Sequence, residues 1–276
     1  MQVPGRRNFV TAGLVAVFCA FALPSHADIH GFNDFTLNGN NPSITGDTLQ
    51  ITTQAIDTDG NPQGYQEANS AFFNTRQSIS AFDAHFTYRL GPVSANASQY
   101  SPADGFTFLL QNSASGVNSV GGPGGDMGAN LDNSTALAFN IYGLHTVGTQ
   151  LIHGGGNVSP LYDSQGDVRL DSGHDIDVDL VYKNHTLTET VSDAVDNTTF
   201  SMSYLTNIQS NVGNDPLAYV GFSGGTGGGT ADQYISNFSF TSLAPVPEAS
   251  TAVTFALLSV GLLTLLVRRR RQASAE

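Results

Sequence analysis

One aspartate and two glycine-rich segments could together hold a polar ligand. Asp104 lies in an Ala-Asp-Gly turn directly before the alternating segment 106–111. Its carboxylate can accept two hydrogen bonds from neighbouring hydroxyl groups of a ligand, and charge-assisted acceptors are the stronger kind. The glycines of 121–125 and 224–229 let backbone N–H groups approach a ligand that a Cβ would keep away. Taken singly, each segment is better explained as a plain turn, and Asp104 as an Asx-turn residue. Their order along the chain favours a binding site.

A second group of carboxylates offers a different chemistry. Alternation places Asp175, Asp177 and Asp179 on one face of a strand, a pattern similar to the Glu-x-Asp-x-Glu of laminarinase-type glycoside hydrolases. Retaining hydrolysis needs two carboxyl groups ~5–5.5 Å apart, whereas residues four apart on a strand are separated by ~13 Å. We therefore prefer an interpretation in which the intervening apolar residues face the core and the aspartates face solvent. Other enzyme signatures are absent from the sequence, so we expect no enzyme, with a glycoside hydrolase as the alternative.

The charge of the central segment limits its partners. Between about Asp28 and Ala244 there are four basic residues against 21 acidic ones, a formal balance of −17. Such a surface repels nucleic acid and anionic lipid headgroups, and it is compatible with Ca²⁺ and neutral sugars. The single cysteine, Cys19, lies in an apolar leader, so disulfides, thiolate metal sites and cysteine nucleophiles are excluded from the segment.

Short alternating runs separated by turn residues indicate an all-β fold. A chain of this length suits one domain, and it shows no internal repeat and no sustained helical period. We expect a jelly-roll β-sandwich whose strands include 49–52, 78–90, 106–111, 136–142, 176–182, 187–191, 219–222 and 235–240.

The run 78–88 shows the alternation most clearly. Its aromatic residues Phe82, Phe86 and Tyr88 fall on one face and should be buried, while Ile79 and His85 fall on the other. We interpret His85 as a solvated or cross-strand residue rather than a ligand.

Both ends of the sequence indicate export. Residues 1–27 have the basic, apolar and small-residue regions of a signal peptide, which leaves Asp28 as the mature start. Residues 245–271 contain Pro-Glu, an uncharged run over 251–267 and four arginines, and they resemble the PEP-CTERM sorting segment recognised by exosortase systems. The run is long enough to span a bilayer, and the arginines and the tail 272–276 should stay cytoplasmic. Ala249 stands where that motif usually has a second proline, and an ordinary C-terminal membrane helix is the alternative.

Residues 28–244 resemble the L-type (legume-type) lectin domain. The resemblance rests on the run Ala103-Asp104-Gly105-Phe106-Thr107-Phe108-Leu109-Leu110-Gln111-Asn112, on the glycine segment 121–125, and on 219–228 near the end. It implies a concanavalin-like sandwich and a carbohydrate site. The residues that it assigns to sugar contact are Asp104, Gly122, Gly124, Asn140, Tyr142, Gly225 and Thr226, with Tyr142 as the stacking aromatic and Thr226 as the hydrogen-bonding side chain of the specificity loop.

The metal ligands of that family are missing. Legume lectins carry Glu-x-Asp where this sequence has Ala138 and Asn140, and the loop 143–149 offers Leu144, His145 and Thr146 in place of the remaining ligands. Ca²⁺ requires six to eight oxygen ligands. We therefore expect no cofactor and no transition metal, and Ca²⁺ is the one ion that we leave as an alternative. The Asn140 amide remains available to Asp104 or to a sugar.

These observations predict an exported carbohydrate-binding protein of the cell surface or extracellular matrix, with a glycan or extracellular polysaccharide as its partner. The sorting segment adds exosortase-type machinery and the membrane, through 251–267, as further partners. The alternatives are the hydrolase and a structural matrix protein whose lectin-like fold no longer binds sugar.

Overall fold

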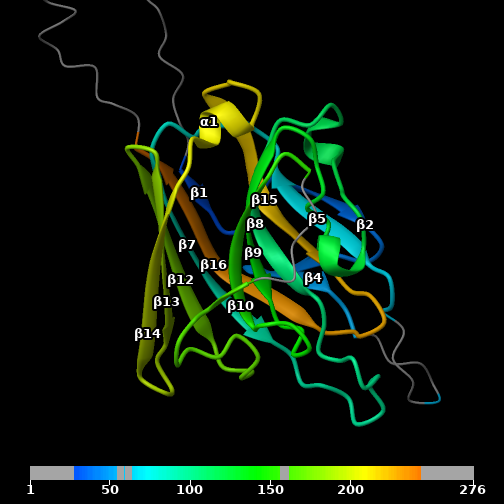
Figure 1. The fold of residues 1–276 in the computed structure, drawn as a ribbon. Coiled ribbons are helices and arrows are strands. Elements are labelled where there is room, and N and C mark those ends of the chain that lie inside the picture. The colour runs from blue at the N-terminus through cyan, green and yellow to red at the C-terminus, as the bar shows by residue number, and fades with distance from the viewer. Residues whose placement is uncertain (1–27, 55–58, 60–63, 156–161, 244–276) are drawn as a thin grey trace, which may run out of the picture.

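The computed structural model describes residues 28–54, 59, 64–155 and 162–243, which form two facing antiparallel sheets (Figure 1). The expected all-β sandwich is confirmed. The predicted signal peptide and the sorting segment with its helix at 251–267 lie outside the described residues. Within the described ranges, no helix has both the length and the apolarity needed to cross a bilayer.

The first sheet presents one face to the core and one to solvent. Its strand order is β14 (Thr198–Leu205), β13 (Thr186–Asp193), β12 (Ile176–Lys183), β7 (Phe82–Leu90), β16 (Gln233–Ser242), β4 (Thr48–Thr52) and β3 (Ser43–Thr45), and β1 (Ile29–His30) pairs with β16. A register shift in β16 between Ser236 and Ser239 breaks its pairing with β7.

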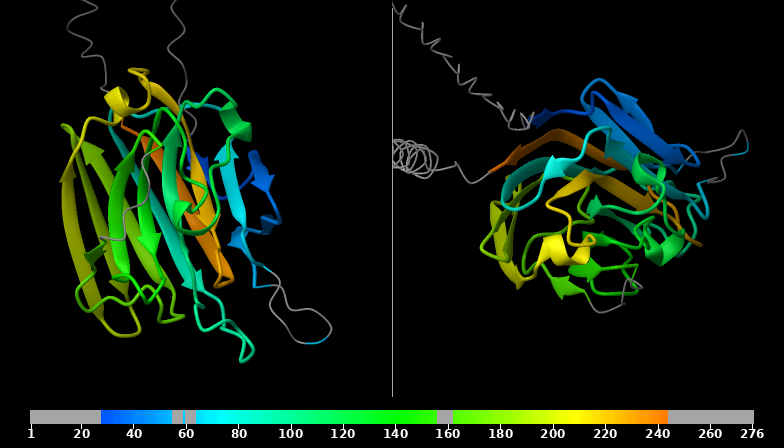
Figure 2. Two further views of the ribbon diagram at one scale, coloured as in Figure 1. Left: turned by 45° about the vertical axis from the view of Figure 1, so that its right-hand side comes forward. Right: turned by 90° about the horizontal axis from the view of Figure 1, so that it is seen from above.

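The second sheet contains the strands that adjoin Asp104 and the two glycine segments. Its order is β11 (Asp163–Ser164), β10 (Gly148–His153), β9 (Ser134–Asn140), β8 (Gly105–Gln111), β15 (Leu217–Gly225), β5 (Ala68–Phe73) and β2 (Phe35–Gly39), and β6 (Gln77–Ser78) pairs with β15. Three short helical turns, η1 (Gly116–Asn118), η2 (Gly124–Asp126) and α1 (Ile208–Asn211), lie in the connections. The turned views of Figure 2 show the two sheets as separate layers.

Aromatic side chains fill the space between the sheets. Phe106 stacks on Tyr88 of the opposite sheet at 4.4 Å and on Phe139 of the neighbouring strand at 4.6 Å between ring centroids. Phe82, Phe86 and Tyr88 are fully buried, as their alternation predicts. Ile79, predicted on the outer face, is also fully buried, because the strand is interrupted between β6 and β7 and the alternation restarts at Phe82.

A smaller apolar cluster covers the far face of the second sheet. There Phe72, Leu109 and Ala136 pack beneath Ala129 and Leu131 of the long connection between β8 and β9. This connection contains the glycine segment 121–125. Its apolar contacts hold that loop against the second sheet.

One carboxyl group is buried between the edges of the two sheets. Glu189 of β13 is fully buried, and its Oε1 accepts hydrogen bonds from Thr149 Oγ1 at 2.7 Å, Gln165 Nε2 at 3.2 Å and the Tyr204 hydroxyl at 3.3 Å. Its Oε2 has no hydrogen-bond partner in the described structure. Burial raises the pKa of Glu189 above the ordinary glutamate value, and the three donors only partly oppose that shift.

The edge strand next to Glu189, β14, has a polar, solvent-facing side. In β14, side chains alternate between exposed and partly buried, and cross-strand hydroxyl pairs join it to β13: Thr188 with Ser203 at 2.8 Å and Thr190 with Ser201 at 3.3 Å. No described strand pairs with the outer side of β14.

We predict that Glu189→Gln flattens the pH dependence of stability. Because the folded-state pKa of Glu189 is raised, wild-type stability should fall as the pH rises above the ordinary glutamate range. Glutamine keeps the accepting oxygen and cannot ionise. At pH 8 the variant should have a higher Tm than wild type, by ~2–4 °C for each ~1 kcal/mol of unfolding free energy that wild type loses through ionisation of Glu189. The difference in Tm should disappear toward pH 4.5.

Thermal melts from pH 4.5 to pH 8 measure this effect. Asp83→Asn, which changes an exposed carboxylate of β7, is the matched control and should follow the wild-type curve. Parallel curves for wild type and Glu189→Gln would contradict the prediction.

Candidate carbohydrate site

Asp104 is held where three strands of the second sheet end. Its backbone N–H donates to the Gly225 carbonyl at 3.0 Å, and its own carbonyl accepts the Ile141 N–H at 3.0 Å. It directly precedes β8, and Gly105 pairs with both Asn140 of β9 and Gly225 of β15. The Ala103–Asp104 peptide bond is cis. The sheet therefore fixes the backbone that carries this carboxylate.

The Asp104 carboxylate retains an unused acceptor. It accepts a hydrogen bond from the Gly227 backbone N–H, while Oδ2 is buried and has no hydrogen-bond partner in the described structure. Burial raises the pKa of Asp104 to about 6. A buried oxygen without a donor is unfavourable, so a ligand hydroxyl that donates to Oδ2 would satisfy it.

A cavity of about 260 Å³ opens beside this carboxylate. Its lining includes Tyr100, Tyr142 and the backbone of Gly228 and Gly229. Tyr100 is 44% exposed, and Tyr142 packs edge-on against His145 with ring centroids 5.1 Å apart. The arrangement combines an acceptor, exposed backbone and two aromatic rings, which suits a ligand with hydroxyl groups and an apolar C–H face.

Glycines allow the loops to close around Asp104. A Cβ on Gly227 would lie 3.0 Å from Asp104 Oδ2, and one on Gly124 would lie 3.9 Å from the same atom. A Cβ on Gly225 would lie 2.9 Å from the Gly124 carbonyl oxygen. Gly124 also has a positive φ of +64°, and its N–H donates to the Thr226 carbonyl at 2.9 Å. These glycines therefore bring two loops against one carboxylate.

Three of the residues expected to contact a sugar have other partners. Gly122 faces Asp126, whose Oδ2 lies 2.5 Å from the position of a Gly122 Cβ. The Asn140 amide donates to the carbonyls of Tyr142 and Thr146, at 3.2 and 2.9 Å. The fully buried Thr226 hydroxyl donates to the Gly64 carbonyl and accepts the Glu67 N–H. Asn140 and Thr226 thus position the site's loops instead of lining its cavity.

The cavity also contains residues that sequence reasoning missed. Tyr100, Gly228 and Gly229 line it and were absent from the expected contacts, although an aromatic residue four positions before Asp104 in a Ser- and Asn-rich loop was a usable signal. Gly227, whose N–H donates to Asp104, was absent as well. The role of Gly227 depends on the approach of one loop to another, for which a single sequence gives no signal.

The described residues around Asp104 do not form a hard-cation site. Ala138, at one position of the family's Glu-x-Asp, packs against Met127 and Tyr162 in a small buried cluster. At the other position, Asn140 directs its amide N–H groups to the carbonyls of Tyr142 and Thr146. Asp104 is then the only carboxylate of the cavity lining, too few oxygens for Ca²⁺.

The aspartates that suggested a hydrolase lie on the outer face of the first sheet. Asp177 accepts a hydrogen bond from Thr87 at 2.7 Å, and Asp179 pairs with His85 Nδ1 at 2.8 Å. Both bonds are cross-strand contacts on an open surface, while Ile176, Val178 and Leu180 are fully buried. The preferred solvent-facing interpretation is confirmed, as is the cross-strand role of His85.

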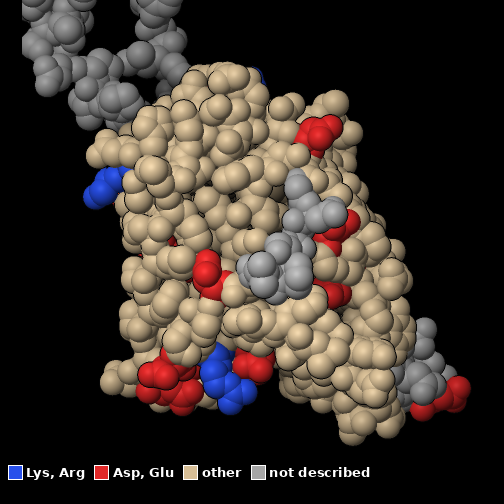
Figure 3. Space-filling model, viewed as in Figure 1, with Lys and Arg blue, Asp and Glu red and all other residues tan. Residues whose placement is uncertain are grey.

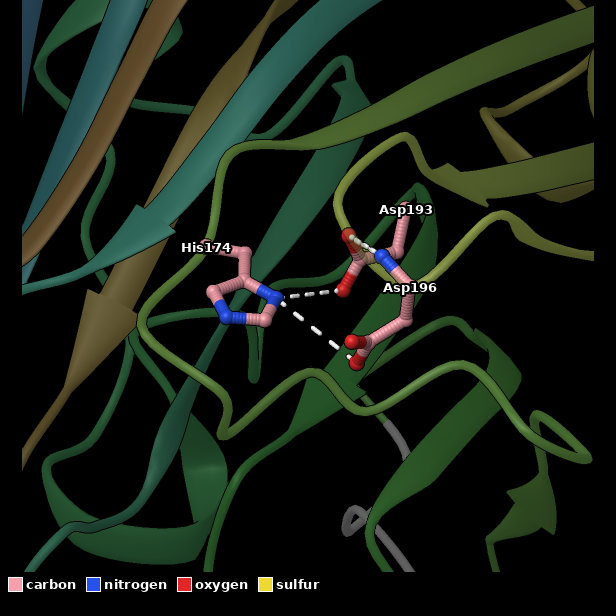
Figure 4. Close-up of side chains that lie close together, drawn as sticks. All are labelled: His174, Asp193 and Asp196. Atoms are coloured by element: carbon pink, nitrogen blue, oxygen red, sulfur yellow. Dashed lines mark hydrogen bonds and ion pairs between the residues drawn. The ribbon is translucent and has the colours of Figure 1, made fainter.

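His174, Asp193 and Asp196 form a separate polar cluster at the β13–β14 turn (Figure 4). His174 Nδ1 lies 2.8 Å from Asp193 Oδ2 and 3.7 Å from Asp196 Oδ2. Asp193 Oδ1 accepts the N–H groups of Val195 and Asp196. The hydrogen bond to Asp193 raises the pKa of His174. Asp193 therefore holds the β13–β14 turn through Oδ1 and contacts His174, which lies before β12, through Oδ2.

Comparison with known proteins agrees with the fold, which is that of a lectin-like carbohydrate-binding domain. The legume lectin domain family matches residues 25–254, and the chain belongs to this family. No curated protein sequence matches the chain at a significant level.

Solved structures share the fold at low sequence identity. The Bauhinia forficata lectin in complex with GalNAc is 21% identical with a TM-score of 0.60, and the winged bean acidic lectin with methyl-α-D-galactose is 18% identical with a TM-score of 0.61. Arcelin-5, a lectin-like defence protein of Phaseolus vulgaris, is 19% identical with a TM-score of 0.59. Each alignment covers 78% of this chain and 97% of the other.

We predict that Gly227→Ala weakens sugar binding. The added methyl would lie 3.0 Å from Asp104 Oδ2, so the carboxylate or the loop must move and the geometry of the acceptor is lost. Loss of one hydrogen bond to a charged group corresponds to roughly 10-fold or more in affinity. Gly125→Ala is the matched control because its Cβ would meet nothing within 4 Å. Equal affinities of the two variants, measured by calorimetry, would contradict the prediction.

Proposed function

We propose that the protein is an exported lectin that binds a neutral glycan at Asp104, at the cell surface or in the extracellular matrix. The observation that carries this proposal is the buried Asp104 Oδ2 without a hydrogen-bond partner, beside a cavity lined by two tyrosines and glycine backbone. Sugar hydroxyls would donate to the carboxylate, and a tyrosine ring would contact the C–H face. The solved lectin complexes with methyl-α-D-galactose and GalNAc make galactose and N-acetylgalactosamine the first sugars to test.

The protein's charge supports a neutral ligand. Figure 3 shows mostly uncharged surface with scattered acidic groups and few basic ones. Together with the balance of −17 over the central segment, this disfavours polyanions and leaves neutral polysaccharide as the expected partner. We propose that Tyr142, Gly124 and Gly225 border the bound sugar, and that Asn140 and Thr226 hold the loops around it.

Asp104→Asn should lower affinity by roughly 10–100-fold, because an NH₂ donor replaces an acceptor in a charge-assisted hydrogen bond. A glycan array on the full-length protein identifies the ligand, and isothermal titration then compares wild type, Asp104→Asn and the control Asp179→Asn, whose carboxylate lies on the open outer face. The control should bind like wild type.

Chelator should reduce binding much less than Asp104→Asn does, because the cavity lacks the oxygens of a Ca²⁺ site. Unchanged binding by Asp104→Asn would place the sugar elsewhere. Complete loss with chelator would reveal metal ligands outside the set described above. An empty array would favour the structural matrix protein.

We also propose that residues 245–271 sort the protein through exosortase-type machinery after membrane insertion of 251–267. The support is the Pro-Glu motif, the uncharged run and the arginine stop. Deletion of 245–276 should release the protein into the periplasm or medium, as measured by fractionation and immunoblotting. A control that replaces only Pro247 and Glu248 with alanine should stay in the membrane without being processed. Membrane retention of the deletion variant would contradict the anchoring role.

A further inference from the structure

A second groove, of about 400 Å³, lies at the end of the first sheet. It is formed where β7 ends and β16 begins, together with the turn 171–173 before β12. The side chains that matter for its chemistry are Arg89, Pro92, Val93, Asp171, Ser172 and Tyr234. None of the contacts assigned to the Asp104 cavity involves these residues.

The groove combines apolar surface with hydrogen-bonding groups. The Arg89 guanidinium carbon lies 5.5 Å from the centroid of the Tyr234 ring, which orients the side chain. Arg89 makes only a long ion pair with Asp175, at 3.7 Å, and its side chain is 55% exposed. Val93 is 44% exposed beside it. Donors on Arg89, acceptors on Asp171 and apolar surface from Val93 and Tyr234 thus converge on one groove.

The groove and the Asp104 cavity lie on two sides of the same loop. Residues 91–104, drawn in teal at the lower end of Figure 1, supply Pro92 and Val93 to the groove and Tyr100 and Asp104 to the cavity. The link across the sandwich is short, because Gln233, the neighbour of Tyr234, donates to the Gly105 carbonyl at 3.1 Å. Gly105 is the neighbour of Asp104. Both openings therefore lie at the same end of the sandwich.

We propose that the groove binds a second unit of the glycan chain whose first unit occupies the Asp104 cavity. The ligand is then an oligosaccharide or polysaccharide that crosses the loop 91–104, and the protein recognises chains in preference to free monosaccharides. This inference rests on the proposed function of the Asp104 cavity. A sugar unit suits the groove because its hydroxyls match Arg89 and Asp171 and its C–H face matches Val93 and the Tyr234 edge.

The surrounding charges favour a neutral chain over a polyanion. Arg89 and Arg169 are each close to an aspartate, at 3.7 Å from Asp175 and 3.3 Å from Asp171. A carboxylated polymer would therefore meet as many negative as positive groups in the groove, on a protein that is strongly acidic overall. Neutral hydroxyls can use the same donors and acceptors without that repulsion.

The test measures affinity against chain length with the full-length protein. The probes are gluco-, manno-, galacto- and xylo-oligosaccharides from disaccharide to hexasaccharide, with the methyl glycoside of each monomer. In the series that binds, wild type should gain at least about 10-fold from methyl glycoside to hexasaccharide, which corresponds to about 1.4 kcal/mol. Arg89→Ala with Tyr234→Thr should lose that gain and keep the affinity for the methyl glycoside.

The controls separate this inference from the proposed function. Arg76→Ala removes a half-exposed arginine that pairs with Asp215 before β15, and it should keep the full gain. Asp104→Asn should weaken binding of every chain length. A wild-type protein that binds the methyl glycoside and hexasaccharide equally well would overturn the groove alone. Hexasaccharide binding that survives Asp104→Asn and is lost in the Arg89 and Tyr234 variant would overturn the Asp104 assignment and keep the groove.

A direct measurement does not depend on the size of the affinity gain. The side-chain Nε–H resonance of Arg89, assigned with Arg89→Ala, should shift on addition of the hexasaccharide and stay unchanged with the methyl glycoside. An unshifted Arg89 resonance at saturating hexasaccharide would overturn the proposal even if affinity rose with length.

Discussion

The stacking of Phe106 between Tyr88 and Phe139 fixes the frame on which the Asp104 cavity and the Arg89 groove depend. The three rings join β8 to β7 across the sandwich and to β9 within the sheet. Phe106 is only two residues from Asp104, and Tyr88 is one residue from Arg89. The same apolar contact therefore sets the position of the carboxylate on one sheet and of the guanidinium on the other. Because buried aromatic stacks tolerate little displacement, the geometry of the sites follows from the core.

Glu189, Glu67 and Asp104 all have raised pKa values, but they differ in what surrounds their unpartnered oxygen. Glu189 has three donors on one oxygen, and Glu67 accepts the Thr53 N–H at 2.8 Å, yet each leaves its other oxygen buried without a partner. Burial raises the pKa of Glu67 to about 7. Glu67 also holds Thr226 through its own backbone. Only the unpartnered oxygen of Asp104 lies beside a cavity with two aromatic rings, which is why that carboxyl is assigned to the ligand.

Much of the fold could be predicted from alternation, because a half-buried strand repeats its environment every two residues. The strands around Phe86, Phe106 and Val178 were found this way. Ile79 was misplaced because a break between strands resets the alternation without any local sign. The inward position of Glu189 follows from the alternation, which places it on one face with Leu187 and Val191. A single sequence does not reveal that Thr149, Gln165 and Tyr204 converge on it.

The site was predictable only in part, for a related reason. Asp104 and Tyr142 were found through a resemblance that fixes their places along the chain, and both line the cavity. Thr226 and Asn140 were expected to face a sugar because their side chains can form hydrogen bonds, but neighbouring backbone groups already use those bonds. Competition between local backbone and ligand for one side chain is decided by tertiary distances, which spacing in the sequence does not encode.

The edge strand β14 of the first sheet is a place where two molecules of the protein could associate. The outer backbone groups of β14 face no described strand, and such a row can template pairing with a second molecule. Ser201 and Ser203 of this strand bond to β13, Leu205 is exposed, and the acidic charge keeps neighbouring molecules at a distance. That repulsion extends over only ~10 Å at 0.1 M ionic strength and shortens as salt is added. At high ionic strength, association of two molecules through this edge would therefore depend on the exposed side chains of β14 more than on the net charge.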